Sequence, residues 1–203
     1  MKQKITIWLF VAAVVIIPIS VFAIVKWYEG HFEALPVLGT DHHLVGDFQF
    51  KDQHGYIISG ETWKNKIVVA NFFFTHCLSV CPKMMKQLKR VQAYGNKNIL
   101  INSFSVDPER DSVEKLKIYA AKLETGENWY LLTGDKKELY RFARKDLMIA
   151  ATDGDGGPDD FIHSENLVLI DLQKRIRGYY KGTNADEVTR LIKDIQKLSN
   201  EHN

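Results

Sequence analysis

The sequence predicts one three-layer α/β domain with a central, mostly parallel sheet, preceded by one N-terminal transmembrane helix. Two observations predict this architecture. The chain opens with a long stretch without charged residues at 5–25, and beyond it short apolar segments typical of strands alternate with segments of helical periodicity. A chain of 203 residues is long enough for one well-buried domain and a short appendage.

Residues 1–28 are expected to form a membrane anchor. Residues 5–25 match the roughly 20 residues that a helix needs to cross a bilayer. Lys2 and Lys4 precede this segment, which predicts a cytoplasmic N-terminus. The chain is therefore expected to cross a bacterial inner membrane once, with its soluble domain on the periplasmic or extracytoplasmic side. A cleaved signal peptide is the alternative, although the apolar run is longer than the usual core of such a peptide.

A connecting segment follows the anchor. Residues 29–46 include Gly30, Pro36 and Gly39 and show little periodicity, so they are expected to act as a linker. The folded domain is expected to cover residues 47–203.

Within the domain, strands are expected to alternate with helices. Residues 67–74 are almost continuously apolar and rich in β-branched and aromatic side chains, as expected of a strand covered on both faces. The next helix is expected to begin near Pro82 and to stop at Gly95. Asp111 is expected to cap the helix after that, in a capping box with Glu114. The remaining predictions are a hairpin turn at Gly55, strands at 99–106, 129–132, 165–171 and 176–180, and helices at 136–145 and 184–198, the last opened by Asn184. The closing strand pair followed by a helix favours a thioredoxin-like arrangement over a larger doubly wound sheet.

The composition argues against two roles. The 27 basic and 25 acidic residues are interspersed and leave a formal charge of +2, so charge predicts no nucleic-acid partner. The chain has 2 cysteines, which cannot hold together a domain of this size in the way that small disulfide-rich proteins are held together. A chemical role for these cysteines is therefore favoured over a structural one.

Cys77 and Cys81 stand at the junction between the buried strand and the following helix. If the helical turn extends over both, their spacing places the two sulfurs on one face. A helix N-terminus stabilises thiolate, the form that attacks disulfides and binds soft metals such as Cu(I). The pair by itself leaves redox chemistry and metal binding both open.

A histidine further along the chain favours metal binding. His163 lies just before the strand expected at 165–171, and the ends of neighbouring strands in such a sheet converge on the loop that carries the cysteines. A neutral imidazole would complete a site of two sulfurs and one nitrogen for copper. A single histidine considered by itself is more often a surface or core residue.

Three separated motifs resemble the Sco (SenC) family in order, spacing and context. They are FFFTHCLSVCP from Phe72 to Pro82, SVDPERD from Ser105 to Asp111, and His163-Ser164 followed by Leu169 and Asp171. The resemblance runs from about Asp47 to the last helix. It implies that Cys77, Cys81 and His163 bind copper, as Cu(I), Cu(II) or both. Many members of the family have proline where this chain has Leu78, which bears only on the shape of the loop.

The resemblance also points to Asp107 as a residue that supports the metal site or contacts a partner. The alternative for Asp107 is turn formation ahead of Pro108.

The function that the resemblance implies is that of a copper metallochaperone for the dinuclear copper centre of cytochrome c oxidase. The implied partners are the copper-bearing subunit of the oxidase and other copper chaperones, and the expected N-terminal helix adds the membrane. A metallochaperone is not an enzyme, but the same thiols leave open a membrane-anchored thiol-disulfide oxidoreductase that reduces cysteines of an oxidase subunit. The usual redox spacing has two residues between the cysteines, whereas this chain has three. A peroxide-reducing enzyme is a third hypothesis, which rests on kinship of fold alone.

Overall fold

The computed structural model describes residues 2–32, 34–40, 43–95, 98–149 and 164–201. The chain divides into two compact units, Met1–Ala34 and Leu35–Asn203. The first unit contains the helix α1 (Lys2–Phe32), with Pro18 inside it. Among the residues that the structure describes, no helix combines the length and the apolar character needed to cross a membrane. The transmembrane helix stays a prediction from the sequence.

The second unit is built around a five-stranded sheet with the order β5-β4-β3-β6-β7. Its strands are β3 (Ile67–Phe73), β4 (Ile99–Ser105), β5 (Trp129–Leu132), β6 (Asn166–Ile170) and β7 (Ile176–Lys181). Strands β3, β4 and β5 run parallel, whereas β6 is antiparallel to both β3 and β7. The sheet is mixed, with β6 running against the other strands, so the predicted mostly parallel sheet is confirmed only in part. The short turn between β6 and β7 reverses the chain and allows only antiparallel pairing there.

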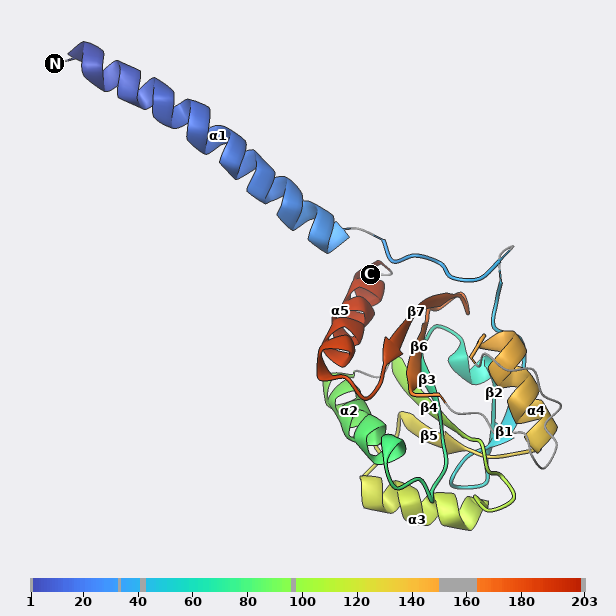
Figure 1. The fold of residues 1–203 in the computed structure, drawn as a ribbon. Coiled ribbons are helices and arrows are strands. Elements are labelled where there is room, and N and C mark those ends of the chain that lie inside the picture. Colours follow the sequence, from blue (N-terminus) through green and yellow to red (C-terminus); the bar gives the residue numbers. More distant parts are fainter. Residues whose placement is uncertain (1, 33, 41–42, 96–97, 150–163, 202–203) are drawn as a thin grey trace. The chain divides into compact units, whose positions relative to one another are not determined.

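Helices and a small second sheet cover the two faces of the central sheet (Figure 1). One face carries α2 (Val80–Tyr94), α3 (Val113–Leu123) and α5 (Ala185–Glu201). The other face carries the antiparallel pair β1 (Gln49–Lys51) and β2 (Ile57–Ser59), the 3-10 helix η1 (Gly60–Trp63), α4 (Lys136–Arg141) and its π-helical continuation η2 (Phe142–Asp146). The predicted three-layer α/β architecture is confirmed.

Strand β3 supplies side chains to the cores on both faces. Ile67, Val69 and Phe73 pack with α2, α3 and α5, whereas Val68 and Ala70 pack into the core on the other face. Successive residues of a strand point to opposite sides, and every residue of β3 is buried. This double burial explains why the segment is almost continuously apolar.

The predicted end of α2 and the predicted cap of α5 are confirmed, whereas the predicted cap of α3 is not. Gly95 ends α2, and Asn184 caps the start of α5. The residue that caps α3 is Ser112, whose hydroxyl accepts a hydrogen bond from a first-turn amide. The capping box predicted for Asp111 and Glu114 is therefore wrong, because other donors hold the Asp111 carboxylate inside the domain.

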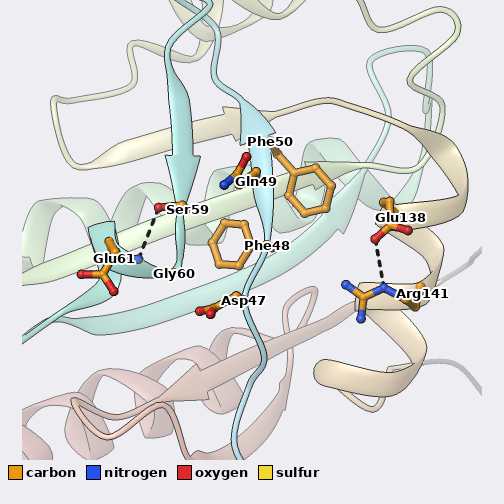
Figure 2. Close-up of a pocket in the computed structure, with 9 residues that line it drawn as sticks. All are labelled: Asp47, Phe48, Gln49, Phe50, Ser59, Gly60, Glu61, Glu138 and Arg141. Carbon is orange, nitrogen blue, oxygen red and sulfur yellow. Dashed lines mark hydrogen bonds and ion pairs between the residues drawn. The ribbon is translucent and has the colours of Figure 1, made fainter.

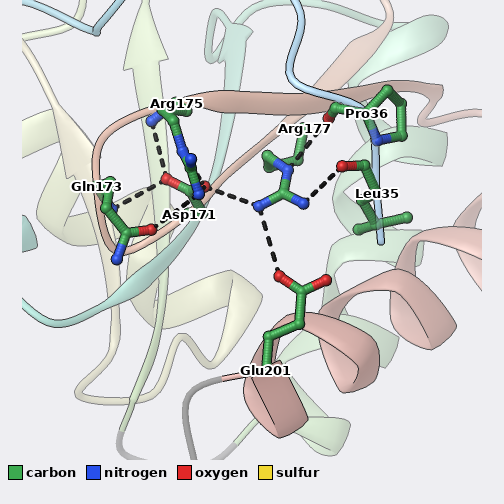
Figure 3. Close-up of polar contacts among 7 residues, drawn as sticks. All are labelled: Leu35, Pro36, Asp171, Gln173, Arg175, Arg177 and Glu201. Carbon is green, nitrogen blue, oxygen red and sulfur yellow. Dashed lines mark hydrogen bonds and ion pairs between the residues drawn. The ribbon is translucent and has the colours of Figure 1, made fainter. Parts of the chain in front are cut away.

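A buried ion-pair network joins the segment before β1 to the last two strands (Figure 3). Arg177 is 4% exposed, and it donates to the carbonyl oxygens of Leu35 at 2.6 Å and Pro36 at 3.1 Å. It also donates to the Asp171 carboxylate at 2.9 Å, as does Arg175 at 2.8 Å. Burial acts to raise the pKa of Asp171, but hydrogen bonds from the two arginines lower it below its ordinary value. Asp171 is therefore held as a carboxylate.

Candidate metal centre

The two cysteines lie where β3 is followed by α2. Cys81 is in the first turn of α2, but the helix begins at Val80, so Cys77 lies in the loop before it. The helical turn therefore does not extend over both residues. They are nevertheless in contact, because the Cys81 N–H donates to Cys77 Sγ at 3.3 Å. Both cysteines are free thiols.

The Cys77 sulfur acts as a helix cap. Ser79 directly precedes α2, but its side chain makes no capping hydrogen bond. The first amides of a helix need acceptors from outside the helix, and Cys77 Sγ is one such acceptor. A thiolate accepts these bonds better than a thiol does, so the start of α2 favours the ionised form of Cys77.

The two thiols differ in acidity. Burial acts to raise the pKa of Cys77, but hydrogen bonds from Cys81 and from the Ser79 and Val80 amides outweigh burial and lower it from the ordinary 9.0. Cys81 is 5% exposed, and burial together with the neighbouring Cys77 raises its pKa to about 12. Cys77 is the nucleophilic, half-buried thiol, and Cys81 is its buried partner.

We expect iodoacetamide to alkylate Cys77 of the reduced chain at lower pH than Cys81, because the thiolate is the attacking species and the pKa of Cys77 is the lower of the two. Mass spectrometry of short labelling pulses over a series of pH values measures both profiles. The same pulses in denaturant are the control, in which the two thiols should react alike. Labelling of Cys81 before Cys77 in the folded chain would contradict the assignment.

A cavity of about 370 Å³ opens beside the cysteines. Cys77 and Cys81 line it together with Ser164 and Glu165, which come from the segment before β6. Ser164 directly follows His163, which itself lies outside the described residues. Within the described part of the chain, no three histidine, cysteine, aspartate or glutamate side chains are grouped so that they could hold a metal. Ligation by His163 therefore stays a prediction.

Asp107 lies in a turn after β4. Its carbonyl oxygen accepts hydrogen bonds from the amides of Arg110 at 3.1 Å and Asp111 at 2.8 Å. Its carboxylate lies 3.8 Å from the Arg110 guanidinium. The turn that the sequence left as one alternative is present, and a role of Asp107 toward metal or a partner stays a prediction.

The buried position of Asp111 was not predicted from the sequence, which indicated a helix cap. Its side chain is fully buried, and its carboxylate accepts hydrogen bonds from the Thr75 hydroxyl at 2.5 Å and the Ser105 hydroxyl at 2.6 Å. Thr75 lies in the loop that carries Cys77. An aspartate just before a helix has the same local signature as a cap, so sequence pattern alone does not separate the two roles.

A larger cavity, of about 430 Å³, lies beside β1, η1 and α4 on the other face of the sheet (Figure 2). Its charged residues include Asp47 and Glu61, and Glu138 accepts a hydrogen bond from Arg141 at 3.0 Å. None of the described residues that line this cavity is a cysteine or histidine. It therefore lacks the soft ligands that copper prefers, and the cavity beside the cysteines is the candidate metal centre.

The fold and the thiol pair together define a class of protein. A sheet covered by helices, with two thiols where a buried central strand meets a helix, is the arrangement of thioredoxin-like proteins that act through cysteine chemistry. Within that class, the family model described as SCO1/SenC matches residues 38–200. The chain belongs to the SCO1/SenC family, and the resemblance that its motifs indicated is confirmed.

Similar proteins agree with this assignment. The chain is 32% identical over 163 residues to the "SCO1 protein homolog" of Bacillus subtilis (strain 168), covering 78% of this chain and 84% of the relative. It is 26% identical to a "Putative copper-binding protein" of Stutzerimonas stutzeri, covering 77% of this chain and 78% of the relative. The solved structure of BsSco, described as a Sco-family cytochrome c oxidase assembly protein with a disulfide switch, matches with a TM-score of 0.68 at 29% identity. That match covers 83% of this chain and 98% of BsSco.

Proposed function

We propose that this protein is a copper metallochaperone that binds copper through Cys77, Cys81 and His163. The observation that carries the proposal is the pair of free thiols in contact at the start of α2, beside a cavity. Thiolate sulfur is a soft ligand that selects Cu(I) over hard cations such as magnesium. The relative named for copper binding and the related oxidase assembly protein support copper as the cargo and cytochrome c oxidase as its destination.

Chain connectivity supports His163 as the third ligand. Ser164 lines the cavity that both cysteines line. Consecutive Cα atoms are about 3.8 Å apart, so the Cα of residue 163 is one peptide unit from a residue of the cavity wall. Imidazole nitrogen is a common copper ligand, and it would complete a site with two sulfurs and one nitrogen.

The unequal burial of the thiols suits delivery of a metal. Cys81 is buried, whereas Cys77 is partly exposed at the cavity. In ligand exchange, a thiolate of the receiving protein would bind copper before Cys77 leaves it, so copper is never released into solution. The expected receiver is the copper-bearing subunit of the oxidase, where the copper would enter the dinuclear centre.

Anaerobic titration of the reduced full-length chain with Cu(I), against a competing chelator, tests the proposal. We expect one tightly bound copper per chain. Its affinity should fall as the pH is lowered, because protons compete for thiolate and imidazole. A chain that binds copper no better than its Cys77→Ser, Cys81→Ser double variant would overturn the proposal.

A second candidate function is that of a thiol-disulfide oxidoreductase that reduces cysteines of an oxidase subunit. The lowered pKa of Cys77 and its contact with Cys81 favour it, since one thiolate can attack a disulfide and the second thiol can then resolve the mixed disulfide. His163 is dispensable in this reaction. Full reductase turnover by a copper-free His163→Ala variant would favour this function over copper delivery.

The proposed location follows from the sequence. Residues 1–28 would anchor the chain in a bacterial inner membrane, with the domain of residues 47–203 on the extracytoplasmic side. Alkaline washing of cell membranes tests the anchor, which release of the chain into the soluble fraction would contradict.

A further inference from the structure

Asp111 is a buried carboxylate that is held by neutral donors close to the proposed metal centre. Its side chain is fully buried, and it accepts hydrogen bonds from the hydroxyl and the amide of Thr75 and from the Ser105 hydroxyl. The imidazole Nδ1 of His76 lies 4.0 Å from Asp111 Oδ1, beyond hydrogen-bond distance. Burying a carboxylate is costly unless hydrogen bonds compensate for the lost water. Asp111 therefore constrains the groups that donate to it.

The two carboxylate oxygens join segments that are distant in the chain. Oδ1 accepts from the Thr75 hydroxyl at 2.5 Å. Oδ2 accepts from the Thr75 amide at 3.2 Å and from the Ser105 hydroxyl at 2.6 Å. Ser105 Oγ in turn accepts from the Asp107 amide at 3.1 Å. Asp111 thus ties the loop after β3 to the end of β4.

The loop that Asp111 holds is the one that carries Cys77. The Cys77 N–H donates to the Phe74 carbonyl oxygen at 3.3 Å, which closes a turn that contains Thr75. Because Asp111 binds Thr75 at both its amide and its hydroxyl, it fixes the backbone and the side chain at this point of the turn. Beyond the turn, Cys77 Sγ has its contact with the Cys81 amide at 3.3 Å.

From these contacts we infer that Asp111 is a positioning residue, which holds the Cys77 sulfur beside Cys81 by binding Thr75. Groups that orient ligands in this way are important for metal affinity even though they do not touch the metal. The effect of Asp111 on copper binding rests on the proposed function. Its effect on the geometry of the two thiols does not, because that effect needs no metal.

Variants of Thr75 test the role while leaving the buried carboxylate in place. Thr75→Val removes the hydroxyl donor at nearly constant size, and Thr75→Ser keeps it. We expect Thr75→Val to weaken Cu(I) binding by about tenfold and to alter the Cu(II)–thiolate absorption. Thr75→Ser should restore both. A folded Thr75→Val chain with wild-type affinity and absorption would overturn the inference.

Ser105→Ala is the matched control. In the wild-type chain, the Ser105 hydroxyl donates to the same Asp111 oxygen as the Thr75 amide does. Ser105, however, lies at the end of β4 and not in the cysteine loop. We expect Ser105→Ala to lower thermal stability and to weaken copper binding less than Thr75→Val does, because Asp111 keeps both of its Thr75 donors. Equal losses of affinity in Ser105→Ala and Thr75→Val would show a general structural effect and would also overturn the inference.

A metal-free measurement separates this role from the proposed function. In a glutathione buffer, Cys77 and Cys81 form a disulfide while one glutathione disulfide is reduced to two thiols, so electrons and protons balance. We expect Thr75→Val to shift this equilibrium about tenfold toward the dithiol, because the two sulfurs are held together less closely. Thr75→Ser should reverse the shift. If the wild-type chain binds no copper but Thr75→Val still shifts the disulfide equilibrium, the copper function fails and the positioning role stands. If Thr75→Val does not shift the disulfide equilibrium, the positioning role is overturned.

Discussion

The Cys81→Ser variant is expected to lose Cu(I) affinity by more than about 100-fold, the upper limit for residues that only support a metal ligand. Serine has nearly the shape of cysteine, so the buried position should stay packed. Its hydroxyl is a harder ligand and does not ionise at neutral pH, so one soft ligand is lost. Competition with a Cu(I) chelator under anaerobic conditions measures the loss.

The matched control for this variant is Met84→Leu. Met84 is one of two methionines near the start of α2; it is fully buried, and its sulfur accepts a hydrogen bond from the Asn71 side-chain amide at 3.9 Å. Leucine is expected to fill the same space and leave copper affinity unchanged. His163→Ala should weaken binding substantially but leave the cysteines able to form a disulfide. Loss of affinity in Met84→Leu, or wild-type affinity in His163→Ala, would contradict the proposed ligand set.

The second large effect is expected from Arg177→Met, which should lower the free energy of unfolding by about 3–5 kcal/mol, as for a buried ion pair that loses one partner. The variant leaves the Asp171 carboxylate buried with one fewer arginine, and it removes the donors to the Leu35 and Pro36 carbonyl oxygens (Figure 3). Urea unfolding of the reduced chain measures the change.

Lys89→Met is the control for Arg177→Met. The Lys89 ammonium lies 2.8 Å from the Glu124 carboxylate, but both side chains are exposed to solvent. Exposed pairs contribute about 0.2–1 kcal/mol, so the unfolding free energy should change little. If Arg177→Met lowers the free energy of unfolding no more than Lys89→Met does, the buried network contributes no more to stability than a surface ion pair.

The effect of Arg177→Met should depend on pH in a defined direction. The pKa of Asp171 is lowered from the ordinary 3.8 in the folded chain, so the stability that its charged form contributes is present above that pH. It is lost as the pH falls through the folded pKa, because the carboxyl group is then protonated in both states. The difference in unfolding free energy between Arg177→Met and the wild-type chain should therefore shrink in acid. A difference that is constant down to acid unfolding would contradict a charged Asp171.

Local patterns in the sequence were sufficient to predict most elements and the thiol pair. The apolar run of β3, the stop at Gly95 and the cap at Asn184 are signals carried by neighbouring residues, so each could be identified without knowledge of the fold. The same is true of Cys77 and Cys81, whose place between a buried strand and a helix follows from the residues on either side.

Only the tertiary structure decided the features that depend on segments distant in the chain. Strand β6 pairs antiparallel with β3, a segment distant in the chain, and local pattern does not specify such a pairing. Asp111 would serve as a helix cap by its sequence, but Thr75 and Ser105 compete for its carboxylate and bring it into the interior. The different pKa values of Cys77 and Cys81 likewise arise from unequal burial and from donors around each sulfur. Burial and hydrogen-bond partners are long-range properties, so they appear only once the chain has folded.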